Sequence, residues 1–135
     1  MKTIFFAAAL AALSVSPVYA ACSSPGSPPT VPDGSTATAD DILKAQQNVL
    51  DFNTATTKFL ACIKKEHDDA IAAAGPGISS TTADKIDQTE SKQHNDAVHQ
   101  LNDVVNRFNQ SVAAFKSKQA ADAAAASQKK SDKPK

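Results

Sequence analysis

The sequence predicts an all-α protein: a long antiparallel two-helix hairpin of coiled-coil type, with an extended leader and a disordered basic tail. Two stretches carry apolar residues at alternating steps of three and four, which places them on one face of a helix. The break Gly75-Pro76-Gly77 separates these stretches. We therefore divide the chain into a signal peptide (1–20), a Pro/Ser-rich leader (21–39), a hairpin (40–118) and an Ala/Lys-rich tail (119–135).

The first helix is expected over residues 40–74. Thr38 and Asp41 have the spacing of a capping box, which satisfies backbone N–H groups at a helix start. Gly75 can adopt the left-handed conformation that ends a helix, and Pro76 cannot continue one. Its predicted core face consists of Ile42, Ala45, Val49, Phe52, Thr56, Phe59 and Ile63.

The second helix is expected over residues 83–118, with Thr81 and Asp84 as its capping pair. Its predicted core face consists of Ala97, Leu101, Val104, Phe108, Ser111 and Phe115. Antiparallel pairing about the break would put Phe108 opposite Val49 and Phe52. The opening turns, 88–95, are polar. We therefore expect poorer packing near the loop than away from it.

The first twenty residues have the pattern of a bacterial Sec-type signal peptide. A basic start is followed by an apolar run from Ile4 to Val15 and by Val18-Tyr19-Ala20, a small-residue cleavage pattern. The run is shorter than the ~20 apolar residues of a membrane span. The mature chain is expected to begin at Ala21 and to be periplasmic or secreted.

The formal charge sums to zero over 135 residues but is distributed unevenly. Residues 40–115 hold eleven acidic and seven basic side chains, a net charge of −4. Residues 116–135 hold six lysines and two aspartates, a net charge of +4. This pattern is not that of a nucleic-acid-binding protein. The lysines could make weak contact with an anionic envelope surface: Lys116, Lys118, Lys129, Lys130, Lys133 and Lys135.

Cys22 and Cys62 are the two cysteines of the chain. Exported cysteines usually pair, and the leader is long enough for Cys22 to reach Cys62 along the first helix. We favour this disulfide, which would staple the leader to the helix. The alternative is a lipid anchor on Cys22, although Tyr19 stands where a lipoprotein signal usually has an aliphatic residue.

No phosphate-binding loop, nucleophile elbow or CxxC motif occurs in the sequence, so we expect neither enzymatic activity nor a cofactor. A weak metal candidate is the group Cys62, Glu66 and His67, because their spacing brings them within about a turn and a half of one helix. It requires a free Cys62. Ordinary solvated charges at a helix end are the favoured interpretation, and we predict no metal.

Three short patterns carry a resemblance to a known group of proteins. They are Cys22 followed by Val31-Pro32-Asp33-Gly34-x-Thr36-Ala37, then Phe59-Leu60-Ala61-Cys62, then Phe108-Asn109-x5-Phe115-Lys116. The chain resembles small exported proteobacterial proteins with a Cys/Pro-rich leader and a helical hairpin. The resemblance implies export, a Cys22–Cys62 pair and a hairpin. It implies no activity, substrate or catalytic residue.

Three functions follow as hypotheses. The first is an interaction or structural protein that binds a protein partner or a second copy of itself. The alternatives are a holdase-like periplasmic chaperone and a metal-binding module. Two helices alone leave apolar residues outside their shared core, so we expect either self-association into a four-helix bundle or coverage by the leader. The predicted interaction face comprises Leu43, Leu50, Leu60, Val98, Val105 and Val112.

Overall fold

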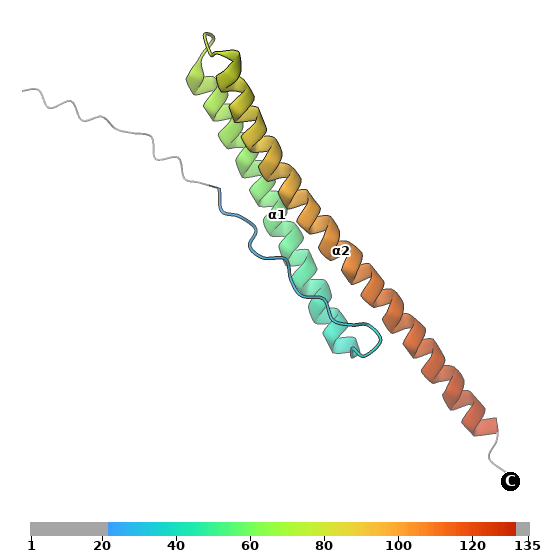
Figure 1. Cartoon of the computed structure of the whole chain (residues 1–135). Coiled ribbons are helices and arrows are strands. Elements are labelled where there is room, and N and C mark those ends of the chain that lie inside the picture. Colours follow the sequence, from blue (N-terminus) through green and yellow to red (C-terminus); the bar gives the residue numbers. More distant parts are fainter. Residues whose placement is uncertain (1–21, 132–135) are drawn as a thin grey trace, which may run out of the picture.

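A computed structural model describes residues 22–131, which form two helices packed against each other (Figure 1). Helix α1 spans Ala39–Ala74, and helix α2 spans Ser80–Ser131. The loop of residues 75–79 reverses the chain, and α2 lies alongside α1 to make a helical hairpin (Figure 1). The all-helical prediction is confirmed over the described residues. The predicted signal peptide, Lys133 and Lys135 lie outside them.

Helix α1 has the bounds that its capping residues predict. The Thr38 hydroxyl accepts a hydrogen bond from the Asp41 N–H at 3.2 Å, and the Asp41 carboxylate accepts one from the Thr38 N–H at 3.0 Å. The Thr38 hydroxyl also donates to Asp41 Oδ2 at 2.7 Å, and these bonds lower the pKa of the Asp41 carboxyl. At the other end Gly75 has a φ of 71°, a value that glycine adopts readily.

Helix α2 begins three residues before the expected start at Ala83. Ser79 caps it in place of Thr81, because the Ser79 hydroxyl accepts a hydrogen bond from the Thr82 N–H at 3.2 Å. The Ser79 and Thr82 hydroxyls are also hydrogen-bonded to each other at 2.9 Å. Ser79 and Thr81 are both capping residue types. The capping-box spacing of Thr81 and Asp84 therefore predicted the wrong capping residue.

The predicted end of the second helix, at Lys118, is also wrong. Helix α2 continues to Ser131, so residues 119–131 of the predicted disordered tail are helical. Alanine has the highest intrinsic helix propensity, and this region is rich in it. Lys118 and Asp122 form an ion pair at 2.9 Å with the spacing that favours a helix. The described side chains from Lys116 to Lys129 are exposed.

The apolar core lies away from the loop. Its buried centre consists of Val49, Phe52 and Val104, with Phe108 packed against it as the sequence predicts. Thr56 is also fully buried, and its hydroxyl donates to the Phe52 carbonyl oxygen at 2.8 Å. A buried hydroxyl therefore costs little here, because its hydrogen bond is made within the same helix.

Residues 22–38 have no helix or strand and lie against the hairpin (Figure 1). Val31 packs on the core of Val49, Phe52 and Val104. A turn follows, in which the Asp33 carbonyl oxygen accepts hydrogen bonds from the Thr36 and Ala37 N–H groups at 3.1 and 2.9 Å. This segment covers part of the apolar surface that two helices leave open. Neither helix described here is long and apolar enough to cross a membrane.

Candidate interaction site

A groove lies between α1 and α2 near the loop, and we call it the loop-end groove. It has a volume of about 530 Å³ and opens to solvent. Its apolar residues are Ile63, Ala70 and Ile86. The residues that line it are Ile63, Glu66, His67, Ala70, Thr82, Lys85, Ile86, Thr89, Glu90 and Gln93.

The groove arises from the composition of α2. Between Thr82 and Gln93 the side chains turned toward α1 are mostly polar, and Ile86 is the one large apolar residue among the lining residues of this helix. From Ala97 onward the same face carries the buried residues Ala97 and Val104. The polar opening turns therefore leave the helices poorly packed at the loop end, in agreement with the expectation from sequence.

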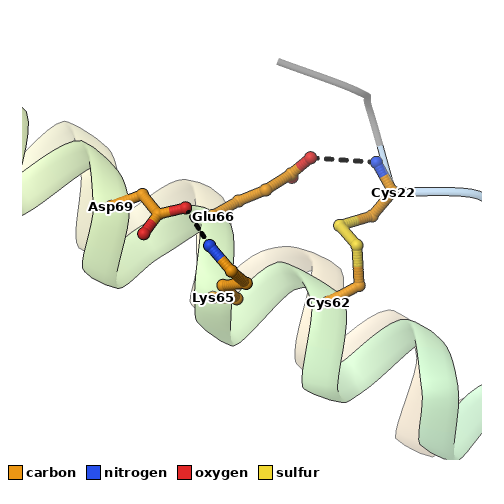
Figure 2. The surroundings of a disulfide bond; sticks show 5 residues. All are labelled: Cys22, Cys62, Lys65, Glu66 and Asp69. Atoms are coloured by element: carbon orange, nitrogen blue, oxygen red, sulfur yellow. Dashed lines mark hydrogen bonds and ion pairs between the residues drawn. A yellow bond between two sulfur atoms is a disulfide. The ribbon is translucent and has the colours of Figure 1, made fainter.

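A disulfide joins Cys22 to Cys62 at the edge of this groove, as the sequence analysis favoured. The two Cα atoms are 5.8 Å apart, within the range of protein disulfides. Figure 2 shows Glu66 extending from the next turn of α1 toward Cys22, where its carboxylate accepts a hydrogen bond from the Cys22 N–H at 3.0 Å. Lys65 and Asp69 form an ion pair nearby at 2.5 Å (Figure 2). The N-terminal segment is thus held to α1 by a covalent bond and a hydrogen bond.

The three metal candidates, Cys62, Glu66 and His67, do not form one group of ligands. The sulfur of Cys62 is bonded to that of Cys22, and Glu66 receives the Cys22 N–H. Donor atoms of Cys22, Cys62 and Glu66 lie within 4.8 Å of one another, so Cys22 takes the position expected for His67. In a disulfide neither sulfur is the thiolate that a transition metal binds.

His67 instead connects the two helices. Its Nε2 lies 2.8 Å from Asp87 Oδ1 on α2, and its Nδ1 lies 3.2 Å from Asp68 Oδ1. Both hydrogen bonds raise the pKa of the His67 imidazole, and the one to Asp87 has the larger effect. Asp68 also accepts from Lys64 at 2.6 Å, and the pKa of its carboxyl is lowered by Lys64 and His67 together.

The predicted interaction face is divided between exposed and partly buried residues. Leu43 and Leu50 are 62% and 50% exposed on α1. Leu60, Val98, Val105 and Val112 are partly buried, and Val105 packs against the core. Among the residues that the structure describes, Leu43 and Leu50 are the large apolar side chains that are exposed, and others such as Ile86 are partly buried. The proposed role of this face stays a prediction.

The loop-end groove was missed as a site from sequence, although Glu66 and His67 were noted for a different chemistry. The polar turns 88–95 were the available signal, since they predicted loose packing without showing that a groove would form, with the partly buried Ala70 and Ile86 and the buried Ile63 among its lining residues. Comparisons of the chain with protein-family models, curated proteins and solved structures gave no match.

Proposed function

We propose that this chain is an exported interaction protein, built as an antiparallel helical hairpin with an extended, disulfide-stapled leader, which binds a protein partner at the loop-end groove. The groove is the observation that supports this proposal most directly. Val31 packs on the core between the helices and the Pro32 carbonyl oxygen accepts a hydrogen bond from Ser111 of α2, whereas no residue of the described segment 22–38 lines the loop-end groove. The apolar part of the loop-end groove stays open to solvent, and an open apolar groove is typical of an interaction site.

Export is supported by two independent features. The first twenty residues have the pattern of a signal peptide. Cys22 and Cys62 form a disulfide, a bond that persists mainly outside the reducing cytoplasm. The proposed location is therefore the periplasm or the medium.

Site-specific photocrosslinking in the native cell would test the proposal. Thr89 lines the groove and is exposed, so p-benzoylphenylalanine can replace it without filling the core. Ser91 is exposed on the outer side of the same helix and is the matched control position. We expect a discrete crosslinked species in the periplasm or medium from Thr89 and none from Ser91. Equal crosslinking from both positions, or a cytoplasmic location, would contradict the proposal.

A further inference from the structure

We propose that the loop-end groove binds a short extended segment of the partner, apolar and without acidic side chains, aligned with the chain's own residues 22–34. The proposal rests on the proposed function, because it names the chemistry of the partner at the same groove. Four features support it: the path of the N-terminal segment, the polar groups placed along that path, the apolar floor and the charges at the rim.

The N-terminal segment already shows how an extended chain lies on this hairpin. Val31 packs on the core, and Gly34 meets the backbone of Ser111 and Phe115 on α2. The described path ends at Cys22, which is bonded to Cys62. Glu66, whose carboxylate accepts the Cys22 N–H, also lines the loop-end groove. The groove therefore begins where the described segment ends, and a bound segment would continue the same path.

Side chains along this path bind backbone groups. The Ser111 hydroxyl donates a hydrogen bond to the Pro32 carbonyl oxygen at 2.7 Å, and the Glu66 carboxylate accepts one from the Cys22 N–H at 3.0 Å. Gln93 precedes Ser111 by 18 positions, or about five turns at 3.6 residues per turn, so both lie on the same face of α2. The Gln93 amide can donate to a carbonyl in the groove as Ser111 donates to Pro32.

This arrangement favours an extended occupant over a helical one. An extended segment leaves its N–H and C=O groups in need of partners, whereas a helix satisfies most of them internally. From Thr82 to Gln93 the groove runs about 17 Å by the helical rise, a length that an extended chain of about five residues spans. Ile63, Ala70 and Ile86 form an apolar floor for alternate side chains of that segment.

The rim sets the charge preference. Glu66 and Glu90 line the groove with one lysine, Lys85, and with His67. The His67 imidazole is hydrogen-bonded to the Asp87 and Asp68 carboxylates, so that its charge is offset. An acidic side chain bound between two carboxylates would be repelled, and its desolvation would add to the cost. Neutral apolar residues meet no such penalty.

The test uses the full mature protein with its disulfide intact and a peptide array as probe. The array holds peptides of about six residues, long enough for the groove, in which each position varies over apolar, polar, basic and acidic types. We expect bound peptides to be apolar and to lack Asp and Glu. Amide NMR shifts on titrating a selected peptide should centre on Ile63, Ala70, Ile86 and Gln93. Selection of acidic peptides, shifts elsewhere on the hairpin, or no binding would overturn the inference.

Two variants, each with a matched control, test the backbone contact and the groove itself. Gln93→Ala should weaken binding about fivefold, which is the loss of one hydrogen bond. Its matched control is Gln88→Ala, on the outer side of α2, which should leave the affinity for the peptide unchanged. Ser91→Glu is the matched control for Thr89→Glu and should also leave the affinity unchanged. Thr89→Glu should abolish binding while the thermal midpoint stays unchanged, since Thr89 is exposed. Equal affinity of Gln93→Ala and the unsubstituted protein would overturn the backbone contact.

The outcome also distinguishes this inference from the proposed function. A peptide that binds the groove as a helix, shown by circular dichroism and by the same NMR shifts, overturns the extended mode and leaves the groove as the partner site. Absence of any Thr89-specific crosslink in cells would instead contradict the proposed function itself.

Discussion

His67 connects α1 to α2 through a side chain whose charge changes near neutral pH. Because Asp87 and Asp68 raise the pKa of the imidazole, its protonated form is favoured in the folded state. The corresponding stabilisation is fully present below the unfolded pKa of about 6.5 and is lost as pH rises through the higher folded pKa. The loop end of the hairpin should therefore be held more firmly in mildly acidic solution.

The variant His67→Gln tests this link. The drop in thermal midpoint relative to the unsubstituted protein should be larger at about pH 5.5 than at about pH 8.5, because the ion pair contributes only in the acidic range. Thermal unfolding followed by circular dichroism at both pH values measures the difference. His99→Gln, an exposed histidine on α2, is the control. A pH-independent difference between His67→Gln and the unsubstituted protein would contradict the assignment.

Gly34 is buried where the N-terminal segment crosses α2. A Cβ atom at this position would overlap the carbonyl oxygen of Ser111 and crowd the Phe115 backbone N. These are helix backbone atoms, which cannot move aside as a flexible side chain can. Lack of a side chain, rather than an unusual backbone angle, is what this site requires.

Gly34→Ala should therefore lower the free energy of unfolding by about 1–3 kcal/mol, the usual cost of overpacking. Gly77→Ala is the matched control, because a Cβ there meets nothing within 4 Å. That change should stay within about 0.5 kcal/mol. Urea unfolding of both variants measures the comparison, and equal stabilities would show that the segment does not hold its position at Gly34.

Among the elements, the N-terminal segment depends most on its covalent attachment. The disulfide links residues 40 positions apart. Loops of this size gain about 4 kcal/mol from the reduced entropy of the unfolded chain. Hydrogen bonds and Val31 hold the segment in addition, so removing the disulfide should loosen it without displacing α1 from α2.

The double variant Cys22→Ser/Cys62→Ser should lose about 3–4 kcal/mol of stability. Its helix content should be retained, and amide exchange should rise at Val31 and its neighbours. Ala61→Ser is the control, since it adds a serine to an exposed neighbouring position of α1 and leaves the disulfide intact. Unchanged exchange at Val31 in the double variant would show that the noncovalent contacts suffice.

The two helices differ in how much of them the sequence could predict. Thr38, Asp41 and Gly75 act through adjacent backbone, so the ends of α1 follow from local chemistry. The end of α2 was misjudged because residues after Phe115 have no face to bury, yet alanine propensity and the Lys118–Asp122 pair still favour helix. The prediction of a disordered tail assumed that a helix needs a buried face, and residues 119–131 form a helix without one.

Ala124→Pro tests whether the last turns of α2 are independent of the hairpin. Proline breaks a helix, so the mean ellipticity should fall by the contribution of roughly ten residues. The thermal midpoint should not change, because the side chains around Ala124 are exposed and contact no core residue. A lowered midpoint would mean that these turns stabilise the hairpin.

At the scale of the whole molecule, packing changes along the hairpin. Val49, Phe52 and Val104 make a buried core in one half, and the loop-end groove occupies the other. The sequence predicted this asymmetry from the polar turns 88–95. It placed only the Cys22 end of residues 22–34, through the disulfide to Cys62, because a proline-rich segment has no periodicity from which to derive the rest of its path. The groove depends on where that segment stops.

This asymmetry predicts a gradient in local stability. Amide hydrogen exchange should be slowest in α1 and α2 around Phe52 and Val104 and faster around Ala70 and Ile86, because few apolar contacts hold the loop end closed. Exchange measured by mass spectrometry on peptic fragments would show it. Uniform protection along both helices would mean that the loop end is packed as tightly as the core.

Helix α2 is longer than α1, and its last turns extend past the beginning of α1 (Figure 1). Ile86 in the groove and Lys129 near the far end are 43 positions apart, or about 65 Å along a single helix. Were the lysine-bearing end held at a surface, the hairpin could position its groove far from that surface. Each deletion of seven residues from the exposed part of α2 after Phe115 would shorten the distance between the groove and Lys129 by about 10 Å, and would leave the core and the groove unchanged.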